Sequence, residues 1–108
     1  VWRAAIEMRP EPGLTTYPGA FVDWDNASRY KHRATVYQGA TPALFGHWLG
    51  ELFKTLPKRN LPEDFVWLNA WNEWAECAYL EPDEHHGYQY LEALHHALSS
   101  TAMAAEVT

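Results

Sequence analysis

The chain has 108 residues, of which 47% are hydrophobic and 20% are charged, and this balance is typical of a globular protein rather than a disordered one. Fourteen acidic residues against eight basic ones give a net charge of −6, with no run of Lys or Arg that could neutralise phosphates, which argues against nucleic acid as a partner. No apolar stretch approaches the roughly 20 residues of a membrane span. The single cysteine, Cys77, can form neither an internal disulfide nor a zinc cluster.

Aromatic side chains are unusually frequent. Six Trp, six Tyr and four Phe make up 15% of the chain. These rings fill cores well, because each buries roughly 150 to 250 Å². They also form flat surfaces on which sugars stack, and the composition alone leaves both interpretations open.

The first predicted elements in chain order are a strand and a helix. Residues 19–24 read as a short strand, Asp25 and Asn26 form a turn signal, and residues 27–40 are expected to be a connecting loop. Thr41 before Pro42 predicts a helix start, with a hydroxyl cap and proline at the first helical position. The apolar face of this helix comprises Leu44, Phe45, Trp48, Leu49, Leu52, Phe53 and Leu56, and Pro57 is expected to end it.

A second strand and a second helix follow. The near-continuous apolar run at residues 64–70 is typical of a strand covered on both faces in a parallel sheet. Beginning at Asp83 or Gly87, a helical pattern carries apolar residues at spacings of three and four and fades after Leu98. We expect residues 101–108 to form a frayed tail.

The order strand, helix, strand, helix predicts an α/β fold with parallel strands and right-handed crossovers. Two parallel strands are too few to form a stable sheet of their own. We therefore expect residues 1–100 to be the C-terminal part of a larger domain, about the last two βα units of a (β/α)8 barrel of the TIM type. The N-terminal part of that barrel would be the partner of this chain.

The segment directly after the second predicted strand carries the densest chemistry. Ligands of parallel α/β folds bind at the carboxyl ends of the strands. Glu73 and Glu76 are three residues apart, so one helical turn would project both carboxylates from the same side, and Trp71 and Trp74 could supply an apolar wall. Such a pair suits acid–base catalysis. The alternative is an ordinary helix start, where Glu is favoured by the macrodipole.

These residues resemble a known family. The string from Asn69 to Glu76, continued by residues 79–83 and by Gly87 and Tyr88, resembles the WbsX-type glycosyltransferase family, which is similar to glycoside hydrolase family 99. Upstream, residues 17–19, 24–26 and Arg29 resemble the same family, so the likeness spans roughly residues 17 to 98 in order.

The resemblance implies a (β/α)8 barrel, no metal or other cofactor, and a role in bacterial surface-polysaccharide synthesis, including lipopolysaccharide O-antigen, in the bacterial cytoplasm. It also implies that Glu73 and Glu76 are the catalytic carboxylates. In the related retaining, endo-acting α-mannosidases the first acid deprotonates the sugar 2-hydroxyl and the second serves the glycosidic oxygen, which implies that Glu73 is a base and Glu76 an acid/base. The family usually has Gly where this chain has Cys77, which suggests a positive φ or a close backbone approach there.

Further residues are candidates for contacts with the carbohydrate substrate or with a sugar-nucleotide donor. Arg29 could meet a phosphate of the donor or pair with an acid. Asp25 and Asn26 could serve the turn alone, which leaves Asp23 as the better contact candidate of the two aspartates. The predicted substrate-binding set is Asp23, Trp24, Asn26, Trp71, Asn72, Trp74, Tyr79 and Glu81.

Three hypotheses about function remain. The first is a carbohydrate-active enzyme that works through Glu73 and Glu76, either as a glycosyltransferase or as an endo-acting retaining glycoside hydrolase. The second is a non-catalytic carbohydrate-binding domain. The third, a metal-binding domain that uses Asp83, His85 and His86, is not supported, because adjacent histidines on a helix point about 100° apart.

Overall fold

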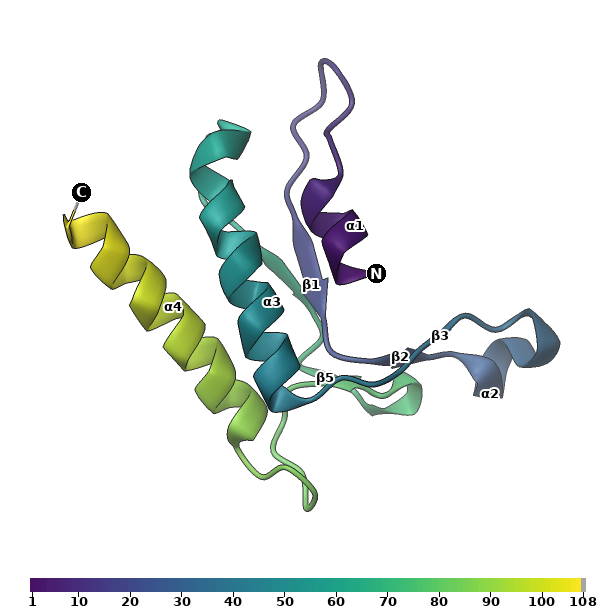
Figure 1. Cartoon of the computed structure of the whole chain (residues 1–108). Helices are drawn as coiled ribbons and strands as arrows, with labels where there is room; N and C mark the ends of the chain where they lie inside the picture. The colour runs from purple at the N-terminus through teal and green to yellow at the C-terminus, as the bar shows by residue number, and fades with distance from the viewer. Residues whose placement is uncertain (108) are drawn as a thin grey trace.

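The structure is a computed structural model that describes the backbone of residues 1–107 and the side chains of residues 1–102 (Figure 1). The described residues form two long α-helices, α3 and α4, two short ones, α1 and α2, very short strands and three one-turn 3₁₀ helices, labelled η. In chain order the elements are α1 (Trp2–Glu7), β1 (Gly19–Phe21), β2 (Trp24–Asp25), α2 (Ala27–Tyr30), η1 (Lys31–Arg33), β3 (Val36–Tyr37), α3 (Pro42–Thr55), η2 (Leu56–Arg59), β4 (Trp67–Asn69), β5 (Asn72–Glu73), η3 (Trp74–Glu76), β6 (Ala78–Tyr79) and α4 (Gln89–Val107).

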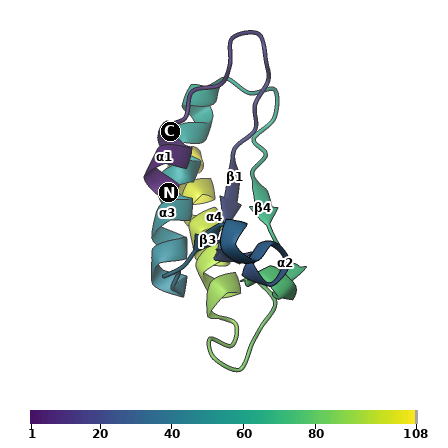
Figure 2. The ribbon, with the colours of Figure 1, turned by 90° about the vertical axis from the view of Figure 1, so that its right-hand side faces the viewer.

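Strands β1 and β4 pair in parallel, with Ala20 opposite Leu68, so the predicted parallel pairing is confirmed. Helix α3 lies between them in sequence and makes the crossover of a βαβ unit. Figure 2 shows that α1, α3 and α4 lie on one side of this strand pair. Both strands therefore end at the same edge of the sheet, and the segments that follow them meet there.

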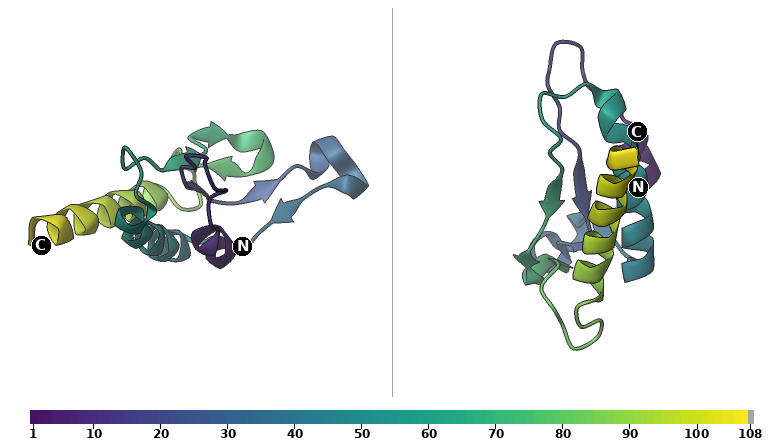
Figure 3. Two further views of the ribbon diagram at one scale, coloured as in Figure 1. Left: turned by 90° about the horizontal axis from the view of Figure 1, so that it is seen from above. Right: turned by 90° about the vertical axis from the view of Figure 1, so that its left-hand side faces the viewer.

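The two faces of the β1–β4 pair have different surroundings. Ala20 is buried and Leu68 packs against the helical core, whereas Trp67, opposite Gly19, is 69% exposed. The expectation of a β4 strand covered on both faces is therefore wrong within this chain, since helices cover one face only. The right-hand view in Figure 3 likewise shows α3 and α4 on one side of the paired strands.

Helix α3 begins and ends where the sequence predicts. The Thr41 hydroxyl oxygen accepts a hydrogen bond from the backbone N–H of Leu44 at 3.1 Å, and the helix gives way to η2 immediately before Pro57. Its buried face comprises Phe45, Leu49, Leu52 and Phe53, with Leu56 of η2 beside them. Leu44 departs from the predicted stripe, because its side chain is half exposed at the first turn of the helix.

Helix α4 packs along α3. A Cβ atom on Gly46 would lie 3.3 Å from the Cβ of Ala93, so small residues let the two helices approach closely. The helix starts at Gln89, two residues after Gly87, and its backbone continues to Val107. Helix therefore occupies most of the segment 101–108 that is expected to be frayed, while Thr108 lies outside the described residues.

Residues 27–40 are not the simple loop that the sequence predicts. The predicted strand over residues 19–24 bends at Val22 and resumes as β2, which pairs in antiparallel fashion with β3. Between these strands, α2 and η1 form a tip that projects away from the helices (Figure 1). Elements of two to four residues have no periodicity that a sequence pattern could reveal.

The chain exposes more surface than a self-contained domain of its size. Its accessible surface is 7914 Å², and its mass is 12.4 kDa. A monomeric protein of that mass exposes about 6,100 Å². The radius of gyration is 15.1 Å, where about 13 Å is typical of 100 compact residues.

Across the described residues, no helix is long and apolar enough to cross a membrane.

Candidate active site

The candidate site occupies residues 70–88, which follow the carboxyl end of β4. The peptide bond between Asn69 and Ala70 is cis, and the chain then forms an antiparallel hairpin of β5 and β6 around η3. The Trp71 carbonyl oxygen accepts hydrogen bonds from the backbone N–H groups of Leu80 and Glu81, which closes the hairpin at its base. The hairpin thus holds the acidic and aromatic side chains of this segment in a fixed loop.

The two candidate catalytic glutamates stand at opposite ends of the one-turn helix η3. Glu73 is the last residue of β5, pairs with Ala78 and is half-buried. Glu76 is the last residue of η3 and is 5% exposed. The expectation of a single α-helical turn that carries both acids is wrong, because the helical turn begins only after Glu73. The two carboxylates therefore have different surroundings, as an acid–base pair requires.

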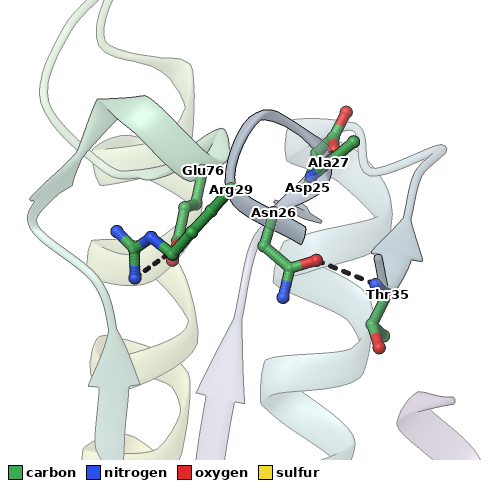
Figure 4. Close-up of polar contacts among 6 residues, drawn as sticks. All are labelled: Asp25, Asn26, Ala27, Arg29, Thr35 and Glu76. Atoms are coloured by element: carbon green, nitrogen blue, oxygen red, sulfur yellow. Dashed lines mark hydrogen bonds and ion pairs between the residues drawn. The ribbon is translucent and has the colours of Figure 1, made fainter. Parts of the chain in front are cut away.

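Arg29 from α2 reaches the buried carboxylate. Its Nη1 lies 3.4 Å from Oε1 of Glu76, as Figure 4 shows. Of the two roles considered for Arg29, the structure therefore contains the pairing with an acid. The tip formed by α2 and η1 thus contributes directly to the surroundings of Glu76.

Asp25 and Asn26 stabilise the backbone of that tip. The Asp25 carboxylate accepts a hydrogen bond from the N–H of Ala27, and the Asn26 amide oxygen accepts one from the N–H of Thr35, both at 2.8 Å (Figure 4). Both residues thus perform the turn chemistry expected of them. They thereby fix the backbone of the tip that carries Arg29.

Trp74 and Tyr79 form a stacked aromatic pair. Their ring centroids are 3.7 Å apart and their planes differ by 13°. Nε1 of Trp74 donates a hydrogen bond to the carboxylate of Glu81. The Trp74 ring is 46% exposed, and it is fixed by Tyr79 on one face and by Glu81 at its edge. The structure therefore brings three of the predicted substrate-binding residues together.

A polar network that the sequence analysis missed supports this pair. The Tyr79 hydroxyl donates to Oδ2 of Asp83 at 2.9 Å, and the N–H of His86 donates to Oδ1 of Asp83. Burial, and then the hydrogen bond to Asp83, raises the pKa of Tyr79 above its ordinary value. The His86 N–H is the main cause of the lowered pKa of Asp83. The sequence signal for this network is the spacing of Asp83 and His86, because an Asp side chain often accepts a hydrogen bond from the backbone N–H three residues further on.

Asp23 and Trp24 lie at the end of the neighbouring strand. The Asp23 carboxylate accepts a hydrogen bond from the N–H of Ala40 at 3.1 Å, and Trp24 pairs with Tyr37 in the β2–β3 ribbon. Burial, and then the charges of Asp23 and Asp83, raise the pKa of Tyr90 to about 12.

The remaining predicted residues differ in exposure and conformation. The side chains of Trp71 and Asn72 are exposed on the hairpin. Cys77 is exposed and has φ 57°, the left-handed region, immediately after η3. The glycine that the resemblance leads us to expect here would suit this backbone conformation. Among the described side chains, no three or more His, Cys, Asp or Glu residues are grouped so that they could hold a metal ion.

Comparison with known proteins places the chain in a family. Residues 1–94 match the family model described as Glycosyltransferase WbsX. The chain belongs to this family of carbohydrate-active enzymes. It is also 41% identical over 98 residues to the protein named "Uncharacterized protein WxcX" in two strains of Xanthomonas campestris pv. campestris, over 87% of this chain. The chain spans 14% of the length of these relatives. No solved structure matches it.

Proposed function

We propose that residues 70–88 supply the catalytic carboxylates of a glycosyltransferase of bacterial surface-polysaccharide biosynthesis, including that of lipopolysaccharide O-antigen. The observation that carries this proposal is the asymmetric pair at η3, with Glu76 buried beside Arg29 and Glu73 half-buried on β5. Membership of the WbsX family supplies the chemical class. The bacterial cytoplasm, where we expect the protein, is part of the same proposal.

The two acids have separate roles in this proposal. Glu73 accepts the proton of the sugar 2-hydroxyl, so that O2 can displace the leaving group at the anomeric carbon from within the sugar. Glu76 gives a proton to the departing glycosidic oxygen. The incoming hydroxyl then attacks the anomeric carbon and breaks its bond to O2, while Glu76 takes the proton of that hydroxyl and Glu73 returns its proton to O2. A hydroxyl-assisted route suits two acids borne on one short hairpin, since a standard nucleophile and acid flank the sugar from two sides. If the acceptor is a second sugar the result is transfer, and if it is water the result is hydrolysis.

We further propose that the β1–β4 pair is part of a (β/α)8 barrel and that this chain contributes about two of its βα units. Three observations support it: parallel pairing across a helical crossover, helices on one face only, and an accessible surface roughly 1,800 Å² above that of a compact monomer. Neighbouring strands of the same barrel would cover Trp67. The candidate site then lies at the carboxyl ends of the strands, where barrel enzymes bind their substrates.

A non-catalytic carbohydrate-binding role is the second candidate. It is favoured by Cys77, because the backbone there is in the left-handed conformation, which suits glycine better than cysteine, directly after Glu76. In this role the fixed and exposed Trp74 ring would bind sugar, while the acids would only accept hydrogen bonds from hydroxyl groups.

Replacement of the glutamates in the intact protein separates the two candidates. Glu73→Gln and Glu76→Gln remove the ionisable group and preserve its shape, so each should abolish formation of a glycosidic product. Glu92→Gln, an exposed position on α4, is the matched control and should leave turnover unchanged. A binding-only protein would instead yield no product with any variant and would retain sugar binding in all of them.

A further inference from the structure

A cavity that neither catalytic carboxylate lines opens beside the hairpin. Its volume is about 630 Å³, and its walls are Trp74, Tyr79, Pro82, Asp83, Glu84, His85, Gly87 and Tyr88. This volume falls in the range of small-molecule sites. Glu73 is adjacent to Trp74 in the chain, so the cavity borders the candidate active site without containing it.

One wall of the cavity is a rigid aromatic surface. Tyr79 stacks against Trp74, and Glu81 binds its indole N–H, so the Trp74 ring cannot turn without breaking both contacts. Asp83 fixes Tyr79 in turn through the tyrosine hydroxyl. A ring held in this way loses little conformational freedom when a ligand packs on it.

The other wall is a tight turn that carries a second ring. The Gly87 N–H donates to the Asp83 carbonyl oxygen at 2.9 Å, and the His86 N–H donates to the Asp83 carboxylate, so the backbone and the side chain of Asp83 both close the turn. Gly87 has φ 55°, which suits glycine. The turn leads directly to Tyr88, whose side chain is 65% exposed.

We infer that this cavity binds one pyranose ring of an oligosaccharide, as a subsite next to the reacting sugar. An apolar sugar face packs on aromatic rings such as Trp74 and Tyr88, and the exposed Glu84 and His85 offer hydrogen-bonding groups for the hydroxyls. Because neither Glu73 nor Glu76 lines the cavity, the ring bound there is a flanking unit. The substrate is therefore at least a disaccharide. This inference rests on the proposed function for the identity of the ligand as a sugar.

The test is binding of simple sugars to the intact protein. The probes are the methyl pyranosides of glucose, galactose and mannose, measured by saturation-transfer difference NMR and by titration of tryptophan fluorescence. We expect at least one probe to bind with saturation transferred to the C–H protons of one ring face. Tyr88→Ala should weaken that binding about tenfold, the equivalent of one aromatic contact. Tyr88→Phe retains the ring and should bind within about twofold of the unchanged protein.

Tyr30→Ala is the matched control, because it removes another exposed tyrosine that does not line the cavity. Its binding should be unchanged. Equal affinity of the Tyr88→Ala variant and the unchanged protein would overturn the subsite, as would absence of binding by every probe up to about 50 mM. The readout is binding and not turnover, so loss of the subsite with intact, Glu-dependent product formation would leave the proposed function standing. Conversely, binding that depends on Tyr88 without formation of any product would support the subsite and overturn the proposed function.

Discussion

Nη1 of Arg29 lies 3.4 Å from Oε1 of Glu76, and the two side chains differ sharply in exposure, at 63% and 6%. The guanidinium therefore lies on the solvent side of a carboxylate that the hairpin otherwise encloses. Asp25 and Asn26 fix the turn that presents Arg29. Arg29, which lies on a short helix between β1 and α3, is thus part of the candidate site.

Removal of the cation should destabilise the protein and reduce its activity. Breaking a buried ion pair from one side costs about 3 to 5 kcal/mol, and the exposure of Arg29 lowers the expected cost of Arg29→Ala to about 1 to 2 kcal/mol. We also expect at least a tenfold loss of turnover, because Glu76 loses the group that positions it. Urea unfolding of the intact protein measures the first effect, and initial rates measure the second.

Arg33→Ala is the control for this change, since Arg33 is exposed on η1 and has no ion pair among the described residues. It should alter the free energy of unfolding by less than about 0.5 kcal/mol. Arg29→Lys retains a positive charge and should recover part of the lost activity. Equal free energies of unfolding and equal rates for Arg29→Ala and Arg33→Ala would show that the ion pair contributes to neither stability nor activity.

Replacement of Cys77 by glycine should stabilise the protein. A non-glycine residue in the left-handed region costs about 1 to 2 kcal/mol, and glycine loses part of that gain through its more flexible unfolded chain. For Cys77→Gly we expect a net gain of roughly 0.5 to 1 kcal/mol in the free energy of unfolding. Cys77→Ala keeps the Cβ and removes the thiol, so its unfolding midpoint should stay near that of the unchanged protein. A stabilising Cys77→Ala would indicate that the thiol, and not the backbone, is unfavourable.

Because Tyr90 is buried, we expect the folded protein to lose stability at alkaline pH. Burial, followed by the charges of Asp23 and Asp83, raises the pKa of Tyr90 from 10.0 to about 12. Between these values the unfolded chain releases the proton and the folded chain keeps it, so the stability is complete below pH 10 and falls as the pH rises toward 12. Tyr90→Phe should remove this part of the decline. Ultraviolet titration at the phenolate band should show one late-titrating tyrosine fewer in the Phe variant than in the unchanged protein.

Trp67→Lys tests the proposed barrel, because we expect it to improve the behaviour of the isolated chain and to destabilise the intact protein. In the isolated chain its 69% exposed side chain lies on the uncovered sheet face, so Trp67→Lys should reduce self-association measured by light scattering. In the intact protein the same change should cost about 3 to 5 kcal/mol, because neighbouring strands would bury the indole. Leu98→Lys, an exposed position on α4, is the control and should be nearly neutral in both. A neutral Trp67→Lys in the intact protein would contradict the barrel.

Much of the backbone could be predicted from local signals. Thr41 before Pro42 marks the start of α3 because a hydroxyl cap and a preset φ act within one turn. The parallel pairing of β1 with β4 follows from the helix between them. Such features depend on neighbours in the sequence, so the sequence reveals them.

The site could be predicted only in part, because its geometry depends on contacts between distant residues. The acids and the aromatic residues of the hairpin are recognisable from their motif, but the fold of η3 separates Glu73 from the turn that carries Glu76. Whether Arg29 meets a phosphate or an acid depends on where α2 packs, and no spacing in the sequence encodes that. The Asp83 network likewise depends on how the turn before α4 places Tyr79 beside Asp83, which the sequence spacing does not encode.

Turnover and sugar binding of the intact protein, measured side by side in the Glu73→Gln, Glu76→Gln and Glu92→Gln variants, test the central claim most directly. The claim predicts that the first two variants form no glycosidic product yet bind methyl pyranosides within about threefold of the unchanged protein. Glu92→Gln should retain both properties. Full turnover by either Glu73→Gln or Glu76→Gln would contradict the assignment of these two carboxylates as the catalytic pair.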